Sequence, residues 1–104
     1  MANAFDGNVV ALDTFTSDVS LRVLMGRTAR RGSMFKIKSI SWGEMTAAHL
    51  AKVRVGTSTG PPLFSQTAAA NNGFYHAYYG GALVSELYLV SAENTGGKII
   101  IVLE

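Results

Sequence analysis

The two histidines, His49 and His76, are the residues of this chain best suited to acid–base or metal chemistry. Neither has Cys, Asp or Glu neighbours at the spacing of a metal site, and the chain contains no cysteine. The carboxylates are scattered and form no local pair of acid and base partners. We therefore predict no catalytic residue, no metal site and no cofactor. The seven carboxylates are Asp6, Asp13, Asp18, Glu44, Glu86, Glu93 and Glu104.

The sequence also lacks the context for nucleophilic catalysis and phosphate binding. One serine fits the pattern Gly-x-Ser-x-Gly, in Gly56-Thr57-Ser58-Thr59-Gly60, but Pro61 and Pro62 follow it and the run is expected to end a strand, whereas a nucleophile elbow joins a strand to a helix. The pattern Gly-x-x-x-x-Gly-Lys-Ser/Thr does not occur. Acyl transfer and nucleotide hydrolysis therefore have no support in the sequence. We expect a protein that is not an enzyme and acts through its surfaces.

One cluster of charge stands out, in a segment with glycine at both ends. Arg27, Arg30 and Arg31 lie between Gly26 and Gly32. Guanidinium groups on a loop form paired hydrogen bonds to carboxylate or phosphate. A solvated loop that only aids solubility is the alternative interpretation. We predict that these three arginines contact a partner.

Four aromatic rings lie close together in a strand-like run. In an extended strand Phe74 and Tyr78 share one face, and Tyr75 and Tyr79 share the other. One set should belong to the core. Because tyrosine is enriched where protein surfaces meet, we expect Tyr75 and Tyr79 at a subunit interface. A platform that stacks on sugar rings is the alternative.

Composition indicates a folded chain that associates. Hydrophobic residues make up 48% of the 104 residues and charged residues only 15%. A surface with so few charges exposes neutral area that a partner can cover. The net charge of +2 gives nucleic-acid binding no support. The sequence shows no secretory leader and no membrane span, so we expect a protein made in a cytoplasm and retained there or assembled into a particle.

The hydrophobic pattern predicts a series of short strands. Alternation is clearest over Ser17–Met25. Over Met34–Gly43 the parity changes between Ile37 and Ile40, which indicates a bulge or a strand whose two ends are buried on different faces. A single turn of helix or a loop is expected over Glu44–Leu50. Gly80 and Gly81 are expected to separate two strands, and Glu93–Gly97 to form a hairpin turn. The other expected strands are Asn8–Phe15, Ala51–Val55, Leu63–Gln66, Phe74–Tyr79, Leu83–Ala92 and Lys98–Leu103.

About eight short strands without a crossover helix predict antiparallel pairing in two packed sheets. We expect one domain over residues 1–104, an all-β sandwich resembling a jelly roll. The last strand is apolar on both faces, as in a central strand or one covered by another subunit. We therefore add Ile100 and Val102 to the expected subunit interface.

Residues 34–104 resemble small β-sandwich structural proteins of tailed bacteriophages. The resemblance rests on the strand Phe35-Lys36-Ile37-Lys38-Ser39-Ile40-Ser41-Trp42, the segment Leu87-Tyr88-Leu89, and the glycine turn with an apolar strand, Gly97-Lys98-Ile99-Ile100-Ile101-Val102-Leu103. It implies a component of the virion, such as a decoration or cement protein that binds the outside of the capsid, commonly as a trimer. The implied partner is the major capsid protein or another virion protein. It carries no catalytic residues across to this chain.

Two other functions remain open at this point. A carbohydrate-binding module on a jelly roll requires that the exposed rings form a platform or cleft. A barrel that binds single-stranded nucleic acid requires a basic groove beside stacking rings, and a net charge of +2 supplies this poorly.

Overall fold

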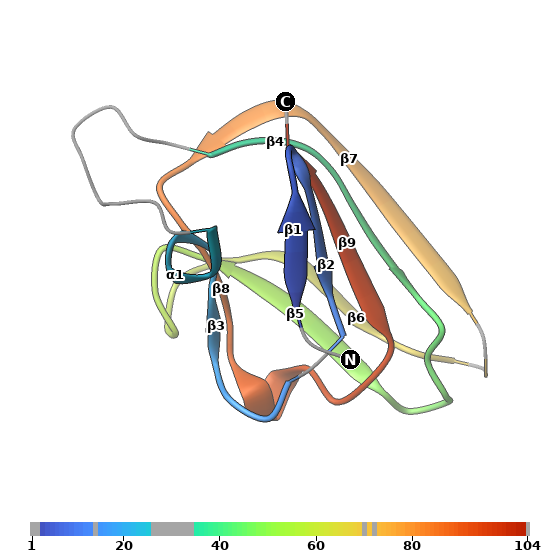
Figure 1. The fold of residues 1–104 in the computed structure, drawn as a ribbon. Coiled ribbons are helices and arrows are strands. Elements are labelled where there is room, and N and C mark those ends of the chain that lie inside the picture. The colour runs from blue at the N-terminus through green and yellow to red at the C-terminus, as the bar shows by residue number, and fades with distance from the viewer. Residues whose placement is uncertain (1–2, 14, 26–34, 70, 72, 104) are drawn as a thin grey trace.

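The computed structural model describes residues 3–13, 15–25, 35–69, 71 and 73–103, and these form a sandwich of two antiparallel sheets (Figure 1). The expected all-β sandwich is confirmed, with nine strands in place of about eight. They are β1 (Ala4–Asp6), β2 (Val9–Leu12), β3 (Val19–Ser20), β4 (Phe35–Gly43), β5 (Leu50–Val55), β6 (Pro62–Thr67), β7 (Phe74–Val84), β8 (Leu87–Leu89) and β9 (Lys98–Leu103).

The strand order identifies the topology. One sheet runs β1-β2-β9-β4-β7 and the other β3-β8-β5-β6. The antiparallel pairs β2 with β9, β3 with β8, β4 with β7 and β5 with β6 are nested inside one another. This is one long hairpin, closed between β5 and β6, that has rolled up into two layers. Nested pairing of eight strands in two sheets is the arrangement of a jelly roll, with β1 added at one edge.

The core lies between the sheets and is built from the alternate residues that face inward. Ile99, Ile101 and Leu103 of β9 are buried beside Val10 and Leu12 of β2. Trp42 of β4 is fully buried, and its indole Nε1 donates a hydrogen bond to the Gly96 carbonyl oxygen at 2.9 Å. The strand β9 lies at the centre of its sheet, between β2 and β4, as its two apolar faces predicted.

The parity change in β4 is confirmed as a bulge. The pairing of β4 with both β7 and β9 shifts between Ile37 and Ser39. As a result Ile37 and Ile40 are both fully buried. The bulge continues into β7, where Gly80 and Gly81 adopt φ angles of 61° and 85°. The prediction that these glycines separate two strands was wrong, because β7 continues through them from Phe74 to Val84.

The predicted strand Ser17–Met25 was also wrong in its second half. It pairs only over Val19–Ser20, and the chain then forms a short helix, α1 (Leu21–Met25). The carboxylate of Glu86 stabilises the start of this helix, because it accepts hydrogen bonds from the Ser20 hydroxyl at 2.5 Å and from the Arg22 backbone N–H at 3.1 Å. Val23, which the alternation over Ser17–Met25 places on one apolar face with Val19 and Leu21, is 81% exposed.

Two connections differ from the expectation. A turn at Gly7, which has a φ of 58°, adds β1 to the edge of β2. The segment Glu93–Gly97 is not a hairpin turn, because β8 and β9 lie in different sheets. It begins at the last residue of a turn of 3-10 helix, η1 (Ser91–Glu93), and crosses from one layer to the other. Residues 44–49 contain a turn and no helix.

In the described part of the chain no helix is long and apolar enough to span a bilayer.

Candidate functional site

The outward side of the five-stranded sheet combines exposed aromatic rings with few charged side chains. Residues paired directly across two strands share a face, so the register assigns one continuous set to this side. We call this set the outer sheet face. It consists of Ala4 and Asp6 (β1), Val9 and Ala11 (β2), Lys98, Ile100 and Val102 (β9), Ser39, Ser41 and Gly43 (β4), and Phe74, His76 and Tyr78 (β7). Beyond the bulge the same side of β4 and β7 continues as Lys36 and Leu83.

The register orders this face into rows that run across the sheet. One row reads Asp6, Val9, Val102, Ser39 and Tyr78 from the β1 edge to the β7 edge. Its two ends are polar and its middle is apolar or small.

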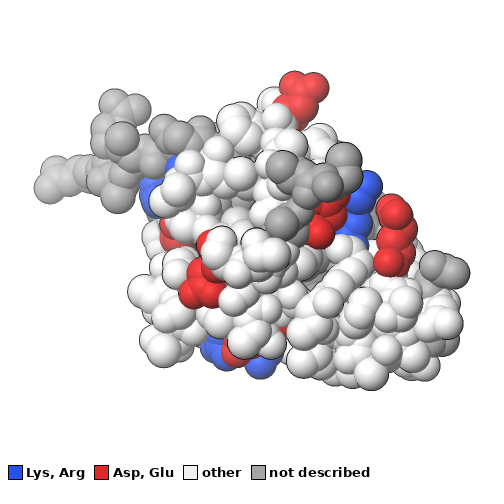
Figure 2. Space-filling view, turned by 60° about the horizontal axis from the view of Figure 1, so that its bottom comes forward, with Lys and Arg blue, Asp and Glu red and all other residues white. Residues whose placement is uncertain are grey.

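The next row reads Ala4, Ala11, Ile100, Ser41 and His76 and carries no carboxylate, lysine or arginine. Charge on this side of the sheet is therefore confined to its margins, at Asp6, at Lys98 and at the exposed Lys36 and Lys38 of β4. Figure 2 likewise shows a molecule with wide uncharged areas between small groups of charged residues.

A ridge of rings runs along the β7 edge of the outer sheet face. Phe74 is 69% exposed and Tyr78 75% exposed. The ring of His76 lies between them, stacked on Phe74 with centroids 6.1 Å apart and edge-on to Tyr78 at 4.6 Å. Because the three rings support one another, the ridge is preorganised. We call Phe74, His76 and Tyr78 the aromatic ridge.

The opposite edge is hollow. A cavity of about 190 Å³ lies over β1 and β2, lined by Ala4, Phe5, Asp6, Val9 and Ala11. Four of these five side chains are apolar. Two of them are alanines, whose small side chains leave space above the sheet. We call this cavity the β1–β2 hollow. The outer sheet face thus carries a ridge at one edge and a hollow at the other.

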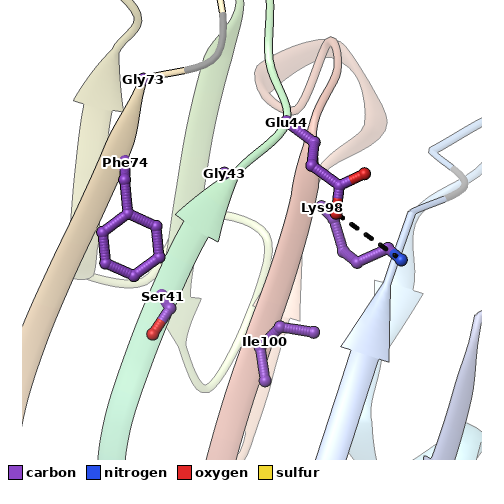
Figure 3. Close-up of a pocket in the computed structure, with 7 residues that line it drawn as sticks. All are labelled: Ser41, Gly43, Glu44, Gly73, Phe74, Lys98 and Ile100. Atoms are coloured by element: carbon purple, nitrogen blue, oxygen red, sulfur yellow. Dashed lines mark ion pairs between the residues drawn. The ribbon is translucent and has the colours of Figure 1, made fainter.

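A second hollow adjoins the foot of the ridge (Figure 3). It has a volume of about 290 Å³, with the Phe74 ring on one side and Ile100 and Ser41 beneath. On the other side the Lys98 ammonium lies 3.8 Å from the Glu44 carboxylate. This pocket offers a ring to stack on and three polar groups at its rim.

Ser41 and His76 form the closest side-chain pair on the outer sheet face. The Ser41 hydroxyl lies 2.6 Å from His76 Nδ1. In the catalytic triad of a hydrolase a serine lies beside a histidine, and a third group orients that histidine. Within the described residues no carboxylate contacts His76, and no group of three or more His, Cys, Asp or Glu could hold a metal ion. The pair holds the ridge against β4.

The structure divides the predicted aromatic residues as the alternation required, with Tyr75 and Tyr79 turned inward. Tyr75 stacks on Trp42 with centroids 5.6 Å apart. The Tyr79 hydroxyl donates to the Leu63 carbonyl oxygen at 2.9 Å, and burial raises the pKa of Tyr79. These two tyrosines close the side of the sandwich, whereas Phe74 and Tyr78 are exposed.

The other predicted site residues have different outcomes. Ile100 and Val102 lie at the centre of the outer sheet face, half-buried on the strand β9. Arg27, Arg30 and Arg31 lie outside the described residues. The β1–β2 hollow was missed, because the sequence does not show that β1 pairs with β2 or that this edge lacks large side chains.

On the opposite side of the molecule an ion pair joins β5 to η1. The guanidinium of Arg54 donates from Nε to Glu93 Oε1 at 2.9 Å and from Nη2 to Oε2 at 2.7 Å. These hydrogen bonds from Arg54 lower the pKa of Glu93. Beside them the buried side chain of Asn94 accepts from the Lys52 N–H at 2.9 Å and donates to the Lys52 carbonyl oxygen at 3.1 Å. The Arg54, Glu93 and Asn94 side chains of this region are thus held by partners within the chain.

No protein-family model, no curated protein and no solved structure matches this chain.

Proposed function

We propose that this chain is a structural component of a virion, a decoration protein that binds the outside of the head and has no enzymatic activity. The observation that carries the proposal is the outer sheet face, which is broad, charged only at its margins and built on the five-stranded sheet, so that copies of the chain can associate through it. A protein that acts by attachment needs a rigid surface of this kind. Jelly rolls occur among capsid proteins as well as lectins, so the fold agrees with the proposal without deciding it.

The proposal includes association into a homo-oligomer. The outer sheet face gathers the exposed side chains of Val9, Phe74 and Tyr78 on one side of the molecule, and exposed apolar side chains that cluster in this way are characteristic of surfaces that bind protein. A repeated attachment protein gains from association, because several weak contacts on one particle add through the oligomer. The resemblance to phage proteins implies three copies, and the proposal itself requires only more than one.

The arginine cluster is the proposed contact with the capsid. We expect Arg27, Arg30 and Arg31 to dock on an acidic surface of the major capsid protein or another virion protein. Exposed ion pairs contribute only about 0 to 1 kcal/mol each, so this contact matters where docking excludes water and repeats across the oligomer.

The test is cosedimentation of the purified chain with particles that lack it. The parent protein should saturate the particles at a fixed stoichiometry. Changing the three arginines to alanine should weaken binding and reduce its dependence on salt, whereas changing Lys36 and Lys38 to alanine serves as the control for general charge loss. If the parent chain does not bind the particles at low or high salt, the proposal is wrong.

A second function, carbohydrate binding, is favoured by the pocket beside Phe74. Sugar rings stack on exposed aromatic rings and take hydrogen bonds from nearby polar groups, and Ser41, Glu44 and Lys98 line this pocket. A glycan array followed by calorimetry tests it. Binding that is lost in Phe74→Ala and kept in Tyr75→Phe would replace the decoration proposal with a lectin-like one.

A further inference from the structure

We propose that the outer sheet face binds the same face of a second copy, through a two-fold axis that runs parallel to the strands near β9. This rests on the surface itself and deepens the proposed function by naming one partner. A face that covers itself is an isologous interface, and isologous contacts close as dimers. The inferred unit is therefore a back-to-back dimer.

The first support is the fit between the two edges of the face. An axis along β9 exchanges the β1 edge of one copy with the β7 edge of the other, because both lie two strands from β9. The aromatic ridge of each copy then stands over the β1–β2 hollow of the other. Two aligned sheets pack at about 30° to each other, so the match requires no unusual geometry.

The second support is the chemistry of the facing rows. In the shared row Asp6 and Tyr78 occupy opposite ends, so the axis places the Asp6 carboxylate of one copy opposite the Tyr78 hydroxyl of the other. A phenol donates to a carboxylate. In the next row His76 comes to lie over the small side chain of Ala4. Ile100 and Val102 approach the axis and are covered by their own counterparts.

The third support is area. The five strands lie about 4.8 Å apart and range from three residues in β1 to eleven in β7. At a mean of about six residues of 3.4 Å they give a footprint on the order of 500 Å² before the relief of the side chains is counted. Stable interfaces bury roughly 800 Å² on each partner. The ridge and the two hollows make the real surface area larger than this flat footprint, so the outer sheet face supplies most of the area that a stable dimer buries.

The experiment is sedimentation equilibrium on the purified full chain, with charge variants at the two ends of the shared row. The parent should be dimeric at micromolar concentration. Tyr78→Glu places carboxylates opposite Asp6 and should weaken the dimer at least tenfold. Adding Asp6→Lys to Tyr78→Glu should restore dimerisation to within about threefold of the parent.

Restoration has one interpretation, because in a single chain the two positions are four strand spacings apart, about 19 Å at about 4.8 Å each. This exceeds the screening length of about 8 Å at physiological salt, so rescue must act between copies. Val23→Glu, which adds the same charge on exposed α1, is the matched control and should leave the dimer intact. Far-UV circular dichroism confirms that every variant is folded.

Several results would overturn the inference. A parent chain that stays monomeric at hundreds of micromolar, or forms trimers, excludes the two-fold dimer. A dimer that tolerates Tyr78→Glu, or that Asp6→Lys does not restore, places the interface elsewhere. A monomer that still saturates virus particles would overturn this inference alone, whereas a dimer that ignores particles would overturn the decoration proposal alone.

Discussion

The hydroxyl of Tyr79 donates a hydrogen bond to the carbonyl oxygen of Leu63 at 2.9 Å. Tyr79 belongs to β7, the edge of the five-stranded sheet, and Leu63 to β6, the edge of the four-stranded sheet. The bond therefore closes one side of the sandwich. It also explains why one set of rings on β7 is structural while the other set is free for contact with a partner.

Replacing Tyr79 by phenylalanine should lower stability without changing association. The ring remains, but the Leu63 carbonyl loses its donor, and a hydrogen bond of this kind contributes about 0.5–1.5 kcal/mol. Chemical denaturation measures the change in the free energy of unfolding. Tyr78→Phe is the matched control at concentrations below those of dimerisation, because Tyr78 is exposed within one chain, and there it should leave the free energy of unfolding unchanged. Equal losses in the two variants would contradict this assignment.

The Arg54–Glu93 pair should make stability depend on acid. Hydrogen bonds from Arg54 hold the pKa of Glu93 below its ordinary value, so the folded state favours the charged carboxylate. The stabilisation is complete above the ordinary pKa of a glutamate and is lost as the pH falls through the lowered pKa. Glu93→Gln should therefore be less stable than the parent at neutral pH, and the difference should disappear in strong acid.

Thermal melts of the parent and Glu93→Gln across this pH range measure the effect. Glu44→Gln is the control, because Glu44 is 75% exposed and its contact with Lys98 is 3.8 Å long. That variant should follow the parent at every pH. A Glu93→Gln difference that persists unchanged into strong acid would show that the loss is one of packing and not of charge.

Gly97 should tolerate no side chain. Its φ is 83°, and an added Cβ would lie 2.6 Å from Trp42 Nε1 and 2.8 Å from the Gly43 carbonyl oxygen. Gly97→Ala should cost about 1–2 kcal/mol for the backbone and a further 1–3 kcal/mol for crowding. Gly7→Ala separates the two terms, because Gly7 has a φ of 58° with open space around it. Denaturation midpoints that match for the two variants would exclude the crowding at Trp42.

Much of the sandwich follows from local pattern. The parity change between Ile37 and Ile40 predicts the bulge in β4, and the two apolar faces of Lys98–Leu103 predict its central place. Both signals are local, because the apolar and polar residues of one strand show by themselves which of its side chains are buried.

The errors arise where distant residues decide the local structure. Glu86 stabilises the first turn of α1 from 66 residues away, so the alternation of Val19, Leu21 and Val23 alone was misleading. Gly80 and Gly81 resemble a turn in sequence, but the bulge opposite them in β4 makes them part of one strand. Neither partner can be identified without the register.

The candidate site shows the same limit. Alternation separated Phe74 and Tyr78 from Tyr75 and Tyr79, but it could not tell which pair faces the core. That depends on the pairing of Trp42 with Tyr75 across β4 and β7, which turns Tyr75 inward. The β1–β2 hollow depends on a turn at Gly7 that places Ala4 beside Ala11.

The most direct test of the central claim is to count this chain in purified virus particles from the source that encodes it, by quantitative mass spectrometry against the major capsid protein. The account predicts that the chain is present in a fixed ratio to the capsid subunit and that salt releases it from intact heads. Its absence from purified particles, or presence only in traces that vary between preparations, would contradict the proposed function.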